Sequence, residues 1–371
     1  MSRFRTPILC LVLAGALALP SAAAGKVRWV VHGGGFGHGV GIGAYGAYGY
    51  GLHGAGYKQI LRHYFRHIRI ERAARPPLVR VLLAIETGDI RFSGATSACG
   101  RSLNPKRSYL AHRNRSSVRL LSASGKLLAR CGGRLRADSR GHVDIAGLGP
   151  YRGALEVVPT RSAAGSLNVV NRLNVNNYAK GVVPREVPPS WPVATLRTFA
   201  VAARSIALST DVGGNGFDLY SDTRTQVYGG MSAETARTNR AVHATRGQIV
   251  TYRGRVAQTF YTSSTGGRTE SRFLGGPQVP YLESVRDPYD YYSPLHRWTF
   301  RFSQAEMNAR LGPYVPGALT GIRVTQRGDS PRIDYAKLIG TRGTATVRGD
   351  TIEYALGLYD RWAFFRKVKV R

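Results

Sequence analysis

Glu186 has the most unusual surroundings of the acidic residues in this sequence. It lies in Val182–Pro189, an apolar stretch with three prolines, whereas most acids between residues 160 and 300 have polar or turn-forming neighbours. Apolar surroundings disfavour the charged form of a carboxyl group and keep it ready to donate a proton, as a general acid must. A structural glutamate paired with Arg185 or Arg204 fits the same context. The residues alone therefore leave both interpretations open.

A glycine-rich segment contains a spacing that resembles a dinucleotide-binding motif. Gly41, Gly43 and Gly46 follow a strand-like stretch. The motif also needs an acid about 20 residues further on, to bind the ribose. No acid stands there, because Glu71 is the first one after residue 24. We therefore expect no nucleotide cofactor and interpret the segment as close-packed backbone that only glycine allows.

His63 and His67 are four residues apart, a spacing that can hold zinc on a helix. The residues between them lack the glutamate of zinc peptidases, so partly buried structural histidines are the preferred interpretation. A G-x-S-x-G nucleophile motif is absent from the sequence, and the cysteines lack the neighbours of a thiol nucleophile. We expect neither a metal nor a cofactor.

Residues 1–24 have the pattern of a secretory signal peptide. Arg3 and Arg5 precede an apolar core, and Ala22–Ala24 supplies small residues for cleavage. The pattern predicts export to the cell wall or the medium. Cys99 and Cys131 are the cysteines beyond this segment, and an oxidising compartment favours one disulfide between them.

The composition is that of a basic globular protein. The 371 residues include 53 lysines and arginines against 21 acids, a formal net charge of +32. Such a charge favours contact with wall polyanions. Nucleic acid is not the expected partner, because the sequence has no long basic run or zinc finger and carries an export signal.

The hydrophobic patterns indicate an α+β fold made of mixed short strands and a few single helices. Strands are expected at 26–32, over much of 78–160, at 167–182 with a turn, at 247–262 and after 297. Helices are expected at 57–67, after Ser190 as N-cap with a buried stripe from Leu196 to Ile206, and near 351–358.

These elements divide the chain into four parts. Residues 1–24 are the signal peptide, and 25–76 form a glycine-rich block that packs on the core. Residues 77–160 form a small β-rich insert with the disulfide, and 161–371 form the core domain.

Several blocks of the sequence resemble, in order, the motifs of the SpoIID/LytB family of sporulation lytic transglycosylases and amidase enhancers. The blocks are 177–188, Trp191–Pro192, Ala200–Arg204, Asp222–Gly230, Ala241–Gly247, Tyr261–Thr269 and Gly349–Leu358. Two departures stand out. The block 33–65 resembles a segment often found at the family's C-terminal end, as if permuted. Thr265 and Arg268 occupy places where some relatives carry zinc-binding Cys and His.

The resemblance implies a peptidoglycan lytic transglycosylase with Glu186 as its single acid and base. It would cleave between MurNAc and GlcNAc in a glycan-binding cleft and leave 1,6-anhydro-MurNAc ends. The resemblance also implies glycan contacts for Arg204, Gln226, Tyr228, Ser263 and Ser264, although each has a structural alternative. A non-catalytic, glycan-binding enhancer of a cell-wall amidase is the second function that the family implies.

Overall fold

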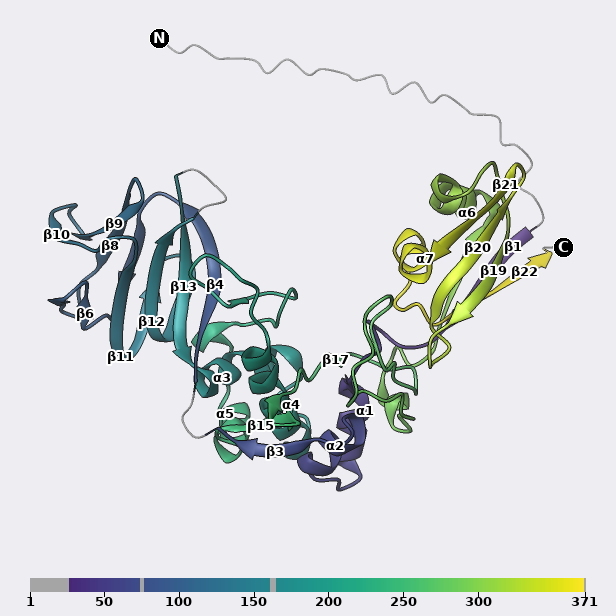
Figure 1. Cartoon of the computed structure of the whole chain (residues 1–371), viewed down its shortest axis with the longest axis horizontal. Helices are drawn as coiled ribbons and strands as arrows, with labels where there is room; N and C mark the ends of the chain where they lie inside the picture. The colour runs from purple at the N-terminus through teal and green to yellow at the C-terminus, as the bar shows by residue number, and fades with distance from the viewer. Residues whose placement is uncertain (1–26, 74–76, 161–164, 370–371) are drawn as a thin grey trace, which may run out of the picture.

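The fold is a mixed α+β arrangement, as the sequence predicts. The computed structural model describes residues 27–73, 77–160 and 165–369; the signal-peptide prediction lies outside these residues. Figure 1 shows a large β-sheet on one side, two smaller sheets on the other, and most of the helices at the base between them. Within the described residues, no helix has the length and apolar character to span a membrane.

The large sheet contains eleven strands, nine of which lie in the order β10-β9-β8-β5-β11-β12-β13-β4-β14, while β6 pairs with β11 and β7. These strands are β4 (Leu78–Thr87), β5 (Ile90–Ser93), β6 (Ser97–Ala98), β7 (Arg101–Ser102), β8 (Tyr109–Asn114), β9 (Ser117–Ser122), β10 (Leu127–Arg130), β11 (Leu135–Ile145), β12 (Gly149–Pro159), β13 (Ser166–Asn174) and β14 (Leu219–Tyr220).

The structure contains the expected disulfide between Cys99 and Cys131. Cys99 follows β6 and Cys131 follows β10, so the bond ties a short hairpin to the outer edge of the sheet. The two residues are 32 apart in the sequence. Closing a loop of that length restricts the unfolded chain and stabilises the fold by roughly 3–4 kcal/mol in the entropy model.

The sheet runs across the boundary that we placed between residues 160 and 161. Strand β13 lies beyond this boundary, yet it pairs with β12 on one side and β4 on the other. Both partners come from the predicted insert. The segment 77–160 is therefore built onto the core through a continuous hydrogen-bonded sheet, because strands that alternate apolar residues pair wherever their registers match.

Helix α3 (Val175–Glu186) was missed in the sequence, where we expected strand and turn up to residue 182. Asn174 caps it: its side-chain oxygen accepts a hydrogen bond from the backbone N–H of Asn177 at 3.0 Å. Asn is a strong N-cap, but the β-branched run Val169–Val170 before it drew the prediction toward strand. Pro184 lies within the last turn of the helix.

Helix α4 (Val193–Ser209) begins three residues after the predicted N-cap Ser190, and Pro192 takes the N-cap position. Its buried stripe contains Leu196, Phe199, Ala203 and Ile206, as expected. The remaining helices of this region are α1 (Ala44–Leu52), α2 (Tyr57–Tyr64) and α5 (Ala236–Ala244). Since α2 ends at Tyr64, His67 lies outside the helix, so the two histidines do not have the spacing of one helical turn that the sequence suggested.

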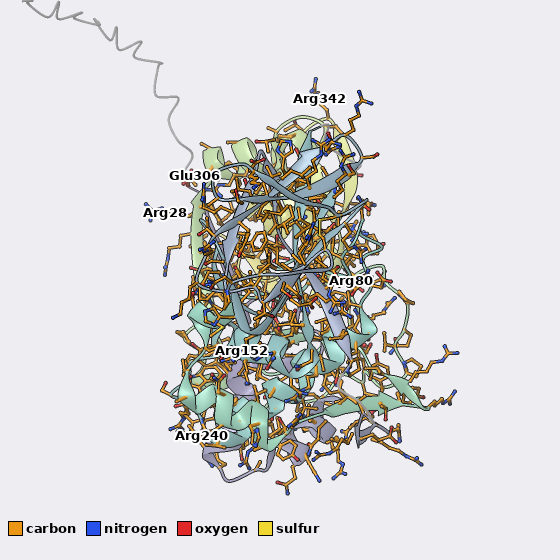
Figure 2. The ribbon with its side chains drawn as sticks, turned by 90° about the vertical axis from the view of Figure 1, so that its left-hand side faces the viewer. Arg28, Arg80, Arg152, Arg240, Glu306 and Arg342 are labelled. Carbon is orange, nitrogen blue, oxygen red and sulfur yellow. A yellow bond between two sulfur atoms is a disulfide. The ribbon has the colours of Figure 1, made fainter. Side chains whose placement is uncertain are left out.

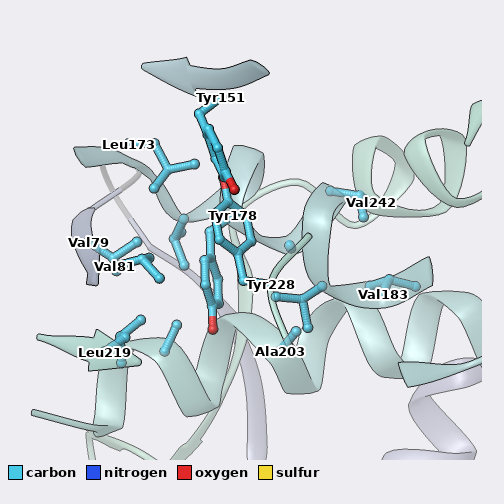
Figure 3. Close-up of a cluster of buried hydrophobic side chains, with 14 of the residues drawn as sticks. Val79, Val81, Tyr151, Leu173, Tyr178, Val183, Ala203, Leu219, Tyr228 and Val242 are labelled. Carbon is cyan, nitrogen blue, oxygen red and sulfur yellow. The ribbon is translucent and has the colours of Figure 1, made fainter. Parts of the chain in front are cut away.

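A column of three tyrosines fills the core between the large sheet and these helices (Figure 3). Tyr151, Tyr228 and Tyr178 follow one another, with ring centroids 5.9 and 5.1 Å apart. In the figure, Val79 and Val81 of β4 lie on one side of the column and Val183 of α3 on the other. Aromatic side chains bury large apolar areas, so this column anchors α3 to the sheet.

The C-terminal residues form a second β-lobe with its own hydrophobic core. Its elements are β1 (Val27–Gly33), β18 (Trp298–Ser303), α6 (Gln304–Leu311), β19 (Leu319–Arg327), β20 (Ile333–Gly340), β21 (Gly343–Arg348), α7 (Gly349–Leu356) and β22 (Ala363–Lys369). The strand orders are β18-β1-β22 and β19-β20-β21. Val27 is paired with Lys369, so the first described strand lies beside the last one. Such a pairing is compatible with the permuted position that we expect for the glycine-rich block.

The glycine-rich block makes close backbone contacts with other segments of the chain. Strand β2 (Ile42–Gly43) pairs in parallel with β17 (Tyr261–Thr262). A Cβ atom added at Gly41 would lie 2.1 Å from the carbonyl oxygen of Phe260, and one at Gly39 would lie 2.2 Å from Arg332. Both glycines also have positive φ angles. Only glycine allows this approach. A small sheet, β16-β15-β3, completes the fold; its strands are β3 (Arg69–Arg72), β15 (Gln248–Tyr252) and β16 (Arg255–Val256).

Candidate active site

Glu186 is the last residue of α3 and lies at the wall of two adjoining cavities. The first, of about 380 Å³, is also lined by His38, Gln226, Phe273 and Tyr261. The second, of about 320 Å³, lies on the other side of Tyr261. Both Glu186 and Tyr261 line both cavities. Among the described residues, Glu186 is the single carboxylate that lines either one.

Neutral hydrogen-bond donors hold the Glu186 carboxyl group. The backbone N–H of Val227 donates to Glu186 Oε1 at 3.1 Å, and the hydroxyl of Tyr261 also hydrogen-bonds the carboxyl group. Within the described part of the chain, Glu186 makes no ion pair, so the structural pairing with Arg185 or Arg204 is absent. A half-buried carboxyl with neutral partners is available for proton transfer.

A chain of side-chain hydrogen bonds orients Tyr261 toward Glu186. The Tyr178 hydroxyl donates to Gln226 Oε1 at 3.3 Å, and Gln226 Nε2 donates to the Tyr261 hydroxyl at 2.9 Å. Because Tyr261 accepts from Gln226, its own proton is free to point at Glu186. Gln226 is buried and has both ends of its amide occupied. The structure thus gives it a positioning role toward Tyr261.

Burial is the main cause that raises the pKa of Glu186 above its ordinary value, and the hydrogen bonds from Tyr261 and Val227 partly oppose that rise. The position of Glu186 in the last turn of α3 acts in the same direction as burial, because the C-terminal end of a helix carries partial negative charge. A raised pKa keeps a larger fraction of the carboxyl protonated near neutral pH, as a proton donor requires.

His38 faces the first cavity from the glycine-rich block. Its Nδ1 accepts a hydrogen bond from the backbone N–H of Val40 at 3.0 Å. Its ring packs on Phe273 with centroids 4.7 Å apart. Burial and the positive charge of Arg332 lower the pKa of His38 to about 4. The imidazole is therefore neutral near pH 7, with Nδ1 as acceptor and Nε2 as donor.

Aromatic side chains line the second cavity. Trp191, just before α4, and Tyr45 of α1 both face it, and their ring centroids are 5.2 Å apart. Tyr48 packs on Trp191 from behind at 4.8 Å. Trp191 and Tyr45 are only half-buried. Their faces offer a rigid apolar surface beside Glu186, suited to a sugar ring or another flat ligand with apolar faces.

The structure does not bring Arg204 and Tyr228 to either cavity. Arg204 is fully buried and donates to Asn176 Oδ1, the Val242 carbonyl and Thr245 Oγ1, at 2.8, 2.6 and 3.2 Å. It joins α3, α4 and α5. The Tyr228 hydroxyl donates to Asn171 Oδ1 at 2.8 Å within the tyrosine column. The hydrogen-bonding groups of both side chains are engaged within the core, so neither side chain is available to a ligand in this arrangement.

The two serines of the predicted glycan contacts separate. Ser263 lines the second cavity together with Glu186 and Tyr45. Ser264 is fully buried, and its hydroxyl donates to both Asp290 oxygens at 3.0 and 2.8 Å. Successive residues of an extended segment point to opposite sides. Because Ser263 and Ser264 are neighbours in the chain, only Ser263 reaches the cavity.

Sequence reasoning missed Tyr261, Trp191, Tyr45 and His38 as site residues. All four stand in segments that we recognised as family blocks, which was the available indication of a role. Their convergence depends on the pairing of β2 with β17, and nothing in the linear sequence specifies that pairing.

Comparison with known proteins finds similarity over part of the chain. A family model described as "Stage II sporulation protein" matches residues 163–252. An uncharacterized protein of Brachyspira hyodysenteriae is 36% identical over 168 residues, 44% of this chain and 45% of that protein. The amidase enhancer of Bacillus subtilis is 36% identical over 132 residues, 35% of this chain and 18% of its own length.

Stage II sporulation protein D of Bacillus subtilis is 28% identical over 207 residues, 51% of this chain and 59% of that protein. The chain therefore spans less than two thirds of each of these relatives. These matches and the motif blocks make this part of the chain similar to proteins of the SpoIID/LytB family. The matched segment 163–252 contains Glu186, Gln226 and Val227.

Proposed function

We propose that this chain acts at the cell wall, outside the cytoplasm, as a peptidoglycan lytic transglycosylase. The observation that carries the proposal is the single carboxylate, Glu186, in a pair of cavities with aromatic walls. Glycosidases that use water generally need two carboxylates, one as acid and one as base or nucleophile. A transglycosylase needs one, because the nucleophile belongs to the substrate.

The reaction proposed for Glu186 has two proton transfers. The protonated carboxyl gives its proton to the oxygen that bridges MurNAc and GlcNAc, and the bond from that oxygen to C1 of MurNAc breaks. The 6-hydroxyl oxygen of the same MurNAc then bonds to C1, and its proton passes to the Glu186 carboxylate. The products are a free GlcNAc hydroxyl and a 1,6-anhydro-MurNAc end, and no water is consumed.

The neighbouring residues have supporting roles in this proposal. Val227 N–H and Tyr261 hold the carboxyl group, and Gln226 orients Tyr261. Trp191 and Tyr45 offer stacking faces for one sugar, and Ser263 lies beside them. Rigid placement of these groups matters because a donor must lie within hydrogen-bond reach of the oxygen that it protonates.

Product analysis tests the proposal directly. Purified protein is incubated with isolated sacculi, with intact or removed stem peptides, and the soluble products are analysed by mass spectrometry. We expect fragments that end in anhydro-MurNAc, each one water lighter than the hydrolysis product. Fragments with reducing MurNAc ends would contradict the transglycosylase chemistry.

The second candidate is a non-catalytic enhancer of a cell-wall amidase. It is favoured by the 36% identity to a protein named amidase enhancer. In this case the two cavities would bind glycan without cleaving it, and a partner amidase would do the chemistry. Stimulation of amidase activity, with no anhydro product from the protein alone, would decide for this function.

A further inference from the structure

A third cavity lies in the large sheet, away from Glu186. Its volume is about 760 Å³, and we call it the arginine pocket. Its lining residues come from β5, β7, β8, β9, β10 and the turns between them: Arg91, Arg101, Ser102, Leu103, Arg107, Ser108, Tyr109, Ser122, Ala123, Ser124, Leu127 and Leu128. Figure 1 shows β6, β8, β9 and β10 at the outer end of the sheet, farthest from α3 and α4. Nothing in the proposed chemistry uses this pocket.

The three arginines of the pocket, Arg91, Arg101 and Arg107, are exposed and have no side-chain ion pair or hydrogen bond within the described residues. Other arginines of the same sheet do pair with carboxylates. Arg80, for example, lies 2.6 Å from Asp218, and Arg152 lies 2.6 Å from Glu234. Three guanidinium groups around one cavity without a carboxylate in its lining leave a net positive site for an anion.

The walls of the pocket are tied together before any ligand arrives. Arg101 is two residues from Cys99, and Leu127 and Leu128 precede Cys131, so the disulfide links the two walls. The loop that carries Arg107 is held as well, because the backbone N–H of Asn104 donates to the Tyr109 hydroxyl at 2.9 Å. A site that is already ordered loses less conformational entropy when it binds.

The chemistry of the lining favours phosphate over carboxylate. The pocket offers many donors, with five N–H groups on each guanidinium and the hydroxyls of several serines, and no side chain that only accepts. A phosphodiester has more acceptor oxygens than a carboxylate, so it can occupy more of these donors. Arginine forms paired hydrogen bonds with phosphate and carboxylate alike, so the number of acceptor oxygens is what favours the phosphodiester.

The apolar residues of the lining further restrict the class of ligand that fits the pocket. Leu103, Leu127 and Leu128 are aliphatic, and Tyr109 is buried with its hydroxyl engaged. Proteins that bind single-stranded nucleic acid use exposed aromatic faces on which bases stack. An aliphatic wall suits the CH₂ and CH groups of a polyol chain instead.

We propose that the arginine pocket binds an anionic polymer of polyols linked by phosphodiesters, such as occurs among wall polymers. The site is separate from the Glu186 cavities and goes beyond the proposed glycan cleavage. Through this pocket, the large sheet would bind a wall polymer and so retain the chain at the cell wall.

The test compares two variants of equal net charge. Arg91→Gln/Arg101→Gln/Arg107→Gln removes the pocket cations. Arg28→Gln/Arg240→Gln/Arg342→Gln removes three exposed arginines that have no side-chain partner within the described residues and that Figure 2 shows far apart on the surface. Binding of fluorescent poly(glycerol phosphate) to the whole exported chain is measured by anisotropy at several salt concentrations, with thermal melting as the check on folding.

Hydrogen bonds to charged groups are each worth about tenfold or more in affinity, so the pocket variant should bind at least about tenfold more weakly. The control variant should lose less than about threefold, because dispersed surface charges are screened by salt. An equal loss of affinity in the two variants would overturn the proposal, because it would show that the polymer is bound by the diffuse positive charge of the surface. If the triple pocket variant unfolds, the three single substitutions make the same comparison.

Two competitor polymers test the ligand class. Polygalacturonate carries carboxylates and single-stranded DNA carries phosphodiesters with bases, and both should bind more weakly than poly(glycerol phosphate). Tighter binding of either one, with the same loss in the pocket variant, overturns the assignment to a polyol phosphodiester. Cys99→Ala/Cys131→Ala should also weaken binding of the intended polymer, and unchanged affinity there would contradict the preordered pocket.

Discussion

Glu186 and a group of buried carboxylates near the C-terminal lobe differ in what surrounds them. At Glu186 the partners are neutral, the hydroxyl of Tyr261 and a backbone N–H, and the group faces open cavities. At the contact between the helices and the C-terminal lobe lies a second set, which we call the junction network: Glu270, Asp287, Asp290 and Asp360 with Arg332. All of its members are buried.

The junction network is closed and largely satisfied. Arg332 and Asp360 form a 2.6 Å ion pair with both side chains 0% exposed. The backbone N–H groups of Asp329 and Ser330 donate to Glu270, each at 3.2 Å. The Thr265 hydroxyl donates to Asp287 at 2.9 Å. This network fixes the glycine-rich block, because Arg332 packs directly against Gly39.

The comparison shows why a perturbed pKa does not by itself identify a catalytic carboxyl. Burial together with the negative charge of Asp290 raises the pKa of Asp287 to about 7, and burial raises the pKa of Glu186 as well. Perturbed groups occur in structural networks as well as in active sites. What distinguishes Glu186 is access: a ligand can reach it, whereas Asp287 is enclosed.

The largest effect is expected from Glu186→Gln compared with Glu270→Gln. Both changes replace a carboxyl by an amide of equal size. Loss of a general acid should lower the rate of anhydro-product formation by roughly 10²–10⁴ with little change in glycan binding. Glu270→Gln should leave the rate of folded protein nearly unchanged. It replaces one acceptor oxygen by an NH₂ group that faces backbone N–H donors, so it should lower stability by about 1–3 kcal/mol.

Rates on digested sacculi and melting temperatures of both variants separate the two groups. Full activity of Glu186→Gln would rule out the proposed mechanism. A large fall in the melting temperature of Glu186→Gln would instead show that Glu186 is structural.

The next largest effect concerns the closed ion pair of the junction network. Arg332→Met should lower the free energy of unfolding by about 3–5 kcal/mol, because it leaves Asp360 buried without its partner. The matched control is Arg348→Met, whose ion pair with Asp350 measures 2.7 Å, against 2.6 Å for Arg332 and Asp360, but is about half exposed. That change should cost less than about 1 kcal/mol. Urea denaturation of both variants measures the difference, and equal losses would contradict the structural role assigned to the network.

Sequence reasoning located Glu186, the proposed proton donor, and the disulfide better than it located the neighbours of Glu186. Glu186, Cys99 and Cys131 stand out by their immediate context, since an apolar stretch or a pair of cysteines is visible locally. The partners of Glu186 come from α1, β17 and the loop at 226–227. Sequence shows those segments but not their registers, which depend on long-range pairing.

The same limit explains the error of secondary structure at helix α3 and bears on the predicted domain boundary. The β-branched residues at 169–170, just before α3, favour a strand, whereas the packing of the tyrosine column favours the helix. The predicted boundary at 160/161 falls between β12 and β13, which pair with each other across it. Arg204 shows the third kind of limit: a motif residue can serve the core rather than the ligand.

A smaller effect is expected at the aromatic wall of the second cavity. Trp191→Ala removes the face that lies beside Glu186 and should weaken glycan binding by about tenfold, as loss of a buried aromatic contact typically does. Tyr354→Ala, which removes an aromatic residue that is 86% exposed on the C-terminal lobe, should leave binding unchanged. Equilibrium binding of soluble glycan strands measures both. Equal binding by Trp191→Ala and the unaltered protein would exclude stacking in this cavity.

The smallest expected effect is a shift in the pH dependence of activity, which tests the hydrogen bond between Tyr261 and Glu186. The hydroxyl of Tyr261 donates to the Glu186 carboxyl and favours its charged form, so Tyr261→Phe should raise the pKa of Glu186 further. A general acid works only while protonated, and its protonated fraction falls as pH rises through the pKa. The alkaline limb of kcat/KM should therefore move to higher pH in this variant, by about half to one unit for one hydrogen bond. Tyr57→Phe removes a hydroxyl that donates to Gln248 Oε1 at 2.8 Å and should leave the limb in place. A limb that moves to lower pH in Tyr261→Phe would mean that the hydroxyl stabilises the protonated carboxyl instead, which would contradict the hydrogen bond that we assign from Tyr261 to Glu186.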